Sequence, residues 1–180
     1  MVRQEHSISA SERRWLMKAV REMSGELYRQ LTGVNEKGLR WRPALSEWCL
    51  KEIAAHARDA ELLYQRQIEV IARSRAPRQL PHEALDVLPA ERDYCSEPLR
   101  LFLYEYEAAR EETVWLLYQL DEDDWLRTGL HPYRGEISIH DIVRELHEHD
   151  LQHLNQARVT REAWDKRSGN PRRDWSDEDA

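Results

Sequence analysis

Two histidines of the chain stand at a spacing that could bind a metal ion. The stretch "ELHEHDLQHLNQ", residues 145–156, contains three of the eight histidines. His149 and His153 are four residues apart, so on a helix they occupy consecutive turns, with Cβ atoms ~5–6 Å apart. Protonated imidazoles this close repel, whereas a divalent cation takes up both nitrogen lone pairs. The spacing alone leaves metal ligands and hydrogen-bonded core histidines as equal alternatives.

The same two histidines continue the apolar stripe of a predicted helix. Apolar residues recur before them at spacings of three and four, at Ile139, Ile142 and Leu146. The continued spacing places His149, His153 and Gln156 on the inward face. His140 and His147 fall on another face and are expected to be solvated.

A metal site needs a third ligand, and His56 is the candidate. It lies in "EIAAHARDAELLYQR". At ~100° per residue it falls beside the stripe of Ile53, Ala57 and Tyr64, where a side chain can reach the seam between two helices. Asp59, one turn later, could orient a ligand or act on a bound water, but a solvated carboxylate is the favoured interpretation.

Two other kinds of chemistry are weaker hypotheses. "HDLQH" is a variant of the zincin motif with Asp150 in place of the glutamate base, but no further zinc ligand follows it, and Asp150 is expected to be solvated. Cys49 falls at a predicted helix start, where the helix dipole lowers a thiol pKa. A small residue that replaces a capping serine is the preferred interpretation of Cys49.

Composition limits the protein class. A length of 180 residues suits one domain, and six glycines with abundant Glu, Arg, Leu and Ala favour helices. The net charge of −7 argues against a nucleic-acid partner. Cys49 and Cys95 are far apart in sequence, which makes a disulfide framework or a cysteine zinc site unexpected. No signal peptide or membrane span is apparent, so a cytoplasmic protein without membrane attachment is predicted.

Periodicity and capping signals predict four helices, in an all-α four-helix bundle that spans residues 1–164. They run from Ser9 or Ser11 to about 31, from about 50 to 74, from after 96 to about 120, and from Ser138 to about 164. Residues 165–180 are expected to be a flexible polar tail. The buried stripe predicted for the first helix comprises Trp15, Ala19, Met23, Leu27 and Leu31.

Two connections differ in length. "RAPRQLPHEALDVLPAERDYCSEP" contains four prolines and is too long for a simple turn, so a crossover that makes the next helix parallel to the previous one is expected. "DEDDWLRTGLHPYRGEIS" is predicted to be a shorter loop, and no strand pattern stands out.

Several short motifs, taken in order, resemble a known family. They lie in "LRWRPALSEWCLKEIAAHARDAELLYQRQI" and "YEAAREETVWLLYQLDEDDWLRTGLHPYRGEISIHDIVRELHEHDLQHLNQ". They comprise a Trp before a helix cap, a helix with one His and a following acidic residue, an Arg-containing helix, a "D-W" with a glycine turn, and "H-x-x-x-H-x-x-Q". Over about residues 12–160 the chain resembles the DinB/YfiT-like superfamily of metalloenzymes, which are four-helix bundles.

The resemblance implies a metal site. By position, the three metal-binding histidines of the family correspond to His56, His149 and His153, and Gln156 stands where the family usually has glutamine. Imidazole ligands suit a divalent transition metal, Zn or Ni first and Fe, Mn or Cu as alternatives. Cys49 departs from the usual serine, which weakens a helix cap and leaves the metal pattern intact.

The resemblance also suggests a reaction. Characterised relatives include thiol-dependent S-transferases and a mycothiol-dependent isomerase, so a metal-dependent transferase is expected to act on a low-molecular-weight thiol and a small electrophile. A hydrolase is less favoured. The alternative is a non-catalytic, stress-associated protein that binds a metal or ligand. A homodimer is expected from the family, and the sequence assigns no catalytic residue.

Overall fold

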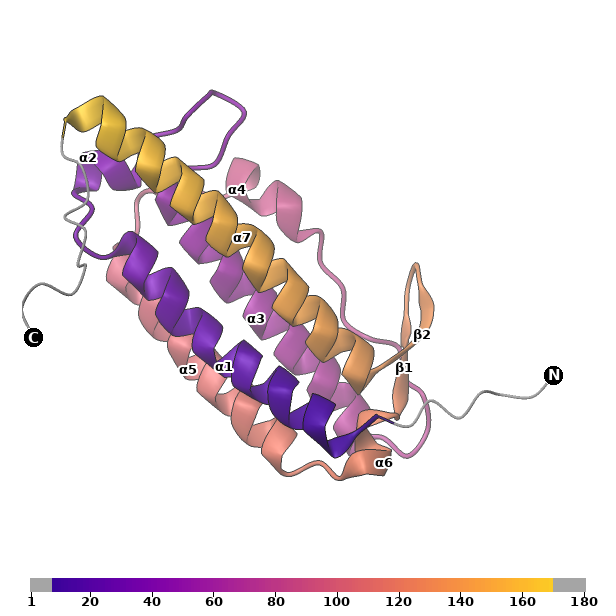
Figure 1. Cartoon of the computed structure of the whole chain (residues 1–180). Coiled ribbons are helices and arrows are strands. Elements are labelled where there is room, and N and C mark those ends of the chain that lie inside the picture. The colour runs from indigo at the N-terminus through magenta and orange to yellow at the C-terminus, as the bar shows by residue number, and fades with distance from the viewer. Residues whose placement is uncertain (1–7, 170–180) are drawn as a thin grey trace, which may run out of the picture.

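Four long helices form the protein, whose computed structural model describes residues 8–169. They are α1 (Ala10–Leu31), α3 (Leu50–Arg73), α5 (Leu99–Tyr118) and α7 (Ile139–Ser168). Short helical turns α2 (Glu36–Leu39), η1 (Leu85–Val87), α4 (Leu88–Glu91) and α6 (Glu122–Trp125) lie in the connections. The predicted four-helix bundle is confirmed (Figure 1).

The expected crossover between the second and third long helices is also confirmed. Arg58 pairs with Glu105, and seven residues later Gln65 donates to Glu112 over 2.9 Å, so α3 and α5 run in the same direction. The connection between them, residues 74–98, therefore runs back along the whole bundle (Figure 1). Helices α3 and α7 are antiparallel, because His56 lies opposite His149 and Tyr64, eight residues later, lies opposite Glu145.

The buried stripe of α1 is shifted by one residue in its first half. Leu16 and Val20 are buried where Trp15 and Ala19 were predicted, and Trp15 is 58% exposed. Both sets have helical spacing, and the aliphatic set fits between α5 and α7 without burying a large indole. Ser9 is the N-cap residue of the helix, and its hydroxyl accepts from the Glu12 N–H at 3.1 Å.

Helix α7 is longer than predicted and continues to Ser168. Ser138 and Asp141 cap its start reciprocally, as the sequence indicated. Gly169 ends it with φ 68°, the left-handed conformation that favours glycine. Of the predicted tail 165–180, the first four residues are therefore helical, and 170–180 lie outside the described residues.

The predicted loop before α7 contains a β-hairpin. Strands β1 (Thr128–His131) and β2 (Gly135–Ser138) pair antiparallel, with Gly135 at φ 77°. The crossover also bonds to this hairpin, because the Leu80 N–H donates to the Leu130 carbonyl at 3.0 Å. Four-residue strands are too short for their alternation to be visible in the sequence. The hairpin thus anchors one end of the crossover.

Two apolar clusters fill the bundle. One lies towards the hairpin and includes Leu16, Ile68 and Leu146, and the other lies towards α2 and includes Leu31, Leu50 and Phe102. The buried charged and polar side chains of Glu61, Arg110, Thr113 and Asp150 lie in the middle of α3, α5 and α7. None of the helices within residues 8–169 is long and apolar enough to cross a membrane.

Candidate metal centre

Helices α3 and α7 bring the three predicted ligands together. His56 and His149 place their Nε2 atoms 2.9 Å apart, although 93 residues separate them in the chain. One nitrogen from each of His56, His149 and His153 can be chosen so that all three lie within 4.8 Å of one another. His56 is buried, and the two α7 imidazoles are half-buried.

Hydrogen bonding fixes the orientation of His153. Its Nδ1 lies 2.8 Å from Gln156 Oε1, which can only accept, so Nδ1 carries the proton and Nε2 keeps its lone pair. A bond to the other ring nitrogen is how metal-ligating imidazoles are usually oriented. The inward position predicted for Gln156 therefore serves the cluster rather than the core.

The imidazoles of the cluster are neutral at physiological pH. Burial, followed by the nearby His153, lowers the pKa of His56 to about 4, although Asp86 acts in the opposite direction. Burial, followed by His153 and His56, lowers the pKa of His149 to about 3. Burial likewise lowers the pKa of His153. Neutral imidazole is the form that binds a metal ion.

Two aromatic residues that the sequence left unassigned form the walls of the cluster. The Trp48 ring stacks on His153 at 5.6 Å between centroids, with 9° between the planes, and lies 4.7 Å from His56. Tyr64 meets His149 edge-on at 5.9 Å. The tryptophan in the quoted motif could have indicated the first contact, whereas nothing in the sequence distinguishes Tyr64 from a core tyrosine.

Asp86 is a further carboxylate that sequence reasoning missed. It lies in η1 of the crossover, and its Oδ1 is 3.9 Å from His56 Nε2, the nitrogen that faces His149. Its side chain is 91% exposed. The proline-rich crossover has no periodic pattern, so its approach to the cluster could not be inferred from spacing.

The donor set fits a divalent transition metal. Nitrogen ligands at 2.0–2.1 Å from a tetrahedral ion are ~3.3 Å apart, a value within the range that these three side chains span. All three donors are imidazoles, which suit Zn, Ni, Fe or Cu. Three protein ligands are fewer than a closed structural site uses, so an ion here would keep a position for a small molecule.

Asp150 does not belong to this cluster, and its predicted solvation is wrong. It is 5% exposed, pairs with Arg110 at 2.8 Å and accepts from the Tyr106 hydroxyl at 3.0 Å. Arg110 also pairs with Glu61 at 2.6 Å. A carboxylate whose oxygens are occupied by a buried Arg and a Tyr hydroxyl cannot be the base of a zincin-type site. The inward stripe of α7 therefore continues from Leu146 to Asp150 and not to His149, which lies half-buried beside it.

Other expectations of solvent exposure also need correction. Asp59 pairs with Arg58 at 2.7 Å and accepts from the Tyr94 hydroxyl, so its oxygens are taken up by these partners and not by solvent. The contact of Asp59 with Tyr94 of the crossover could not be inferred from the sequence. On α7, His140 bonds to Glu12 at 3.1 Å, and His147 packs edge-on against Trp15 at 5.3 Å.

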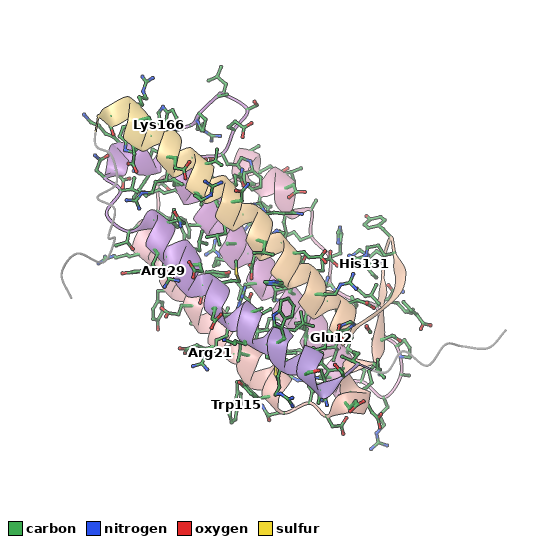
Figure 2. All side chains as sticks on the ribbon, in the orientation of Figure 1. Glu12, Arg21, Arg29, Trp115, His131 and Lys166 are labelled. Carbon is green, nitrogen blue, oxygen red and sulfur yellow. The ribbon has the colours of Figure 1, made fainter. Side chains whose placement is uncertain are left out.

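Figure 2 shows the Glu12 and His131 side chains towards the hairpin end of the bundle. The His131 ring lies 5.1 Å from that of His82, on the crossover, and it takes no part in the three-histidine cluster.

Cys49 is the N-cap residue of α3, as predicted, and its N–H donates to Glu52 Oε2 at 2.8 Å. Burial raises the pKa of the Cys49 thiol to about 12, which outweighs any lowering by the helix dipole. The thiol is completely buried, so an external substrate cannot reach it as a nucleophile.

Known proteins are similar to this chain over most of its length. A family model described as the DinB superfamily matches residues 12–157. The uncharacterized protein YuaE of Bacillus subtilis is 20% identical over 148 residues, which covers 76% of this chain and 91% of YuaE.

A solved structure shows the same fold. YfiT of Bacillus subtilis, described as a probable metal-dependent hydrolase with an unusual four-helix bundle topology, superposes with a TM-score of 0.80. The match covers 93% of this chain and 94% of YfiT at 13% identity. At that identity the likeness concerns the fold.

Proposed function

The chain belongs to the DinB superfamily, and we propose that it is a metal-dependent enzyme that transfers a low-molecular-weight thiol to a small electrophile. One observation carries the proposal: His56, His149 and His153 converge their nitrogens between two helices, and two of the rings are partly exposed. Such a set holds an ion and leaves it accessible.

The residues around the cluster have separate roles in this proposal. His56, His149 and His153 hold the ion, and Gln156 keeps His153 in the tautomer that offers Nε2. Trp48 and Tyr64 provide apolar walls, which restrict water and accept an apolar electrophile. When bound, the divalent ion supplies Lewis acidity that keeps a thiol in its thiolate form without a protein base.

The lack of an evident base favours a thiol over water as the nucleophile. A water nucleophile commonly needs a general base within hydrogen-bond reach. Within residues 8–169, no carboxylate hydrogen-bonds to any of the three imidazoles, and Asp59 is held by Arg58 and Arg92. Asp86 does lie near the cluster, with its Oδ1 3.9 Å from His56 Nε2, but its side chain is largely exposed to solvent.

Hydrolysis is the second candidate, because Asp86 could act as the base and because YfiT is described as a probable metal-dependent hydrolase. A non-catalytic protein that binds the ion without turnover is the third. The three candidates predict different reactions. A transferase consumes a thiol, a hydrolase needs only water as its second substrate, and a binding protein catalyses neither reaction.

The experiment compares these outcomes on one preparation. Protein loaded with zinc or nickel is mixed with cysteine or glutathione and chlorodinitrobenzene, and separately with nitrophenyl acetate without thiol. We expect thiol conjugation above the uncatalysed rate, lost in His149→Ala and retained in His140→Ala, a matched histidine on the same helix. Ester hydrolysis without conjugation would support the hydrolase instead. No reaction with any thiol would support a binding protein.

A further inference from the structure

Two thiols outside the histidine cluster lie next to each other where the crossover ends. Cys49 at the start of α3 and Cys95 before α5 place their sulfurs 3.6 Å apart, and both are free thiols. We propose that this pair is an oxidisable dithiol, which a low-molecular-weight disulfide converts into an intramolecular disulfide. The proposal concerns residues other than the three histidines and does not depend on the proposed enzyme activity.

Both backbones are held in place by buried hydrogen bonds. Lys51, 2% exposed, donates to the carbonyls of Cys95 at 3.2 Å and Glu97 at 2.8 Å. Glu52 accepts from the Cys49 N–H at 2.8 Å. Because Lys51 already joins the two chain segments, the sulfurs have to close only from 3.6 Å to about 2.05 Å to form the bond.

The two thiols differ in access, which sets the order of reaction. Cys95 is half-buried and can meet a small reagent, whereas Cys49 is completely buried. The Cys95 sulfur attacks the reagent disulfide RSSR, so a Cys95–SR bond forms and one RS⁻ leaves with the Cys95 proton as RSH. The Cys49 sulfur then attacks Cys95, and the second RS⁻ leaves with the Cys49 proton. Two thiols are oxidised, and RSSR is reduced to two RSH.

A metal ion held by Cys49, Cys95 and Glu52 is the competing possibility, since these three groups lie within 4.8 Å. Glu52 is already bound by Arg42 and by the Cys49 N–H. The surroundings therefore favour the disulfide.

The disulfide would join the end of the crossover to the first turn of α3. It would close the loop from residue 49 to residue 95, which reduces the entropy of the unfolded chain. It also adjoins Trp48, the residue that stacks on His153. We expect the oxidised protein to melt several degrees higher than the reduced protein.

The test uses the full-length protein, reduced and then incubated with oxidised glutathione. The chain has two cysteines, so thiol titration and intact mass give a complete readout. We expect both thiols to disappear, the mass to fall by two hydrogens, and the melting temperature to rise. Cys49→Ser should stop at a glutathione adduct on Cys95, and Cys95→Ser should keep its buried thiol unmodified.

Three outcomes would overturn the proposal. They are two thiols that persist after oxidation, a wild-type protein that retains glutathione, and zinc that remains in His149→Ala but is absent from Cys95→Ser. If Cys49→Ser does not fold, wild type and Cys95→Ser alone still decide, because only wild type can form the internal bond.

Discussion

Two polar clusters adjoin on helix α7, and neighbouring residues point into each. His149 belongs to the histidine cluster, whereas Asp150 belongs to the charged cluster formed with Glu61, Tyr106 and Arg110. In the charged cluster, positive and negative groups contact one another, and every residue is buried. In the histidine cluster, three neutral bases face one another without an anion in hydrogen-bonding contact.

The difference separates a structural role from a binding role. Burial alone lowers the pKa of Arg110, but Asp150 and Glu61 more than offset it, and the net pKa is raised above the usual value. That guanidinium is saturated by its partners and has no capacity for a ligand. The imidazoles instead turn ring nitrogens towards one another, with the Nε2 atoms of His56 and His149 only 2.9 Å apart. Neutral ligand nitrogens at such close range are what a metal ion binds.

The largest effect on stability is expected from a substitution that breaks the charged cluster. Arg110→Ala leaves Glu61 and Asp150 buried without their counter-charge, so the free energy of unfolding should fall by about 3–5 kcal/mol. Urea denaturation measures this change. Arg158→Ala, which removes an exposed pair with Glu162, is the control and should cost less than about 0.5 kcal/mol. A comparable loss in both variants would refute the structural role of Arg110.

The next effect concerns how the stability of the metal-free protein depends on pH through the histidine cluster. Since the pKa of His56 is about 4 in the folded protein and about 6.5 in the unfolded chain, the unfolded chain binds more protons between these values. The free energy of unfolding should therefore decrease by about 3 kcal/mol as pH falls from 6.5 to 4, and change little above 6.5 for this group.

Denaturation of metal-free protein across this pH range measures the effect. His56→Leu should show a smaller decrease because it removes the titrating group. An unchanged slope in that variant would contradict the assignment of the effect to His56.

A smaller effect tests how the ligands are oriented. Gln156→Ala removes the acceptor that fixes the tautomer of His153, so metal affinity should weaken by roughly 10–100-fold. Competition with a chelator measures it. Gln152→Ala, an exposed position on the same helix, should leave the affinity unchanged.

The smallest effect concerns the crossover. Asp86→Asn removes the negative charge near His56 and should weaken metal affinity less than about 10-fold, because the carboxylate is largely exposed to solvent. Glu91→Gln, another exposed carboxylate of the crossover, is the control. Equal affinities in the two variants would show that Asp86 does not act on the cluster.

Much of this arrangement was predictable from periodicity. The four long helices and the crossover follow from apolar spacing, capping residues and loop length. The pair His149 and His153 was visible because both lie on one helix, four residues apart. His56 was placed near the seam by helical angle, and the family resemblance selected it.

The rest depends on contacts between distant segments. Asp150 looked solvated because its partners, Arg110 and Tyr106, come from another helix. The proximity of Cys49 to Cys95 arises from the path of the crossover, which carries no periodic signal. One-residue errors, such as Trp15 for Leu16, occur where two stripes have the same helical spacing.

Metal analysis tests the central claim most directly. Wild type, His149→Ala and Arg110→Lys are incubated with zinc or nickel, freed of excess by gel filtration, and measured by elemental analysis. We predict close to one ion per chain in wild type, almost none in His149→Ala, and the wild-type value in the folded fraction of Arg110→Lys. Equal metal content in wild type and His149→Ala would contradict the account.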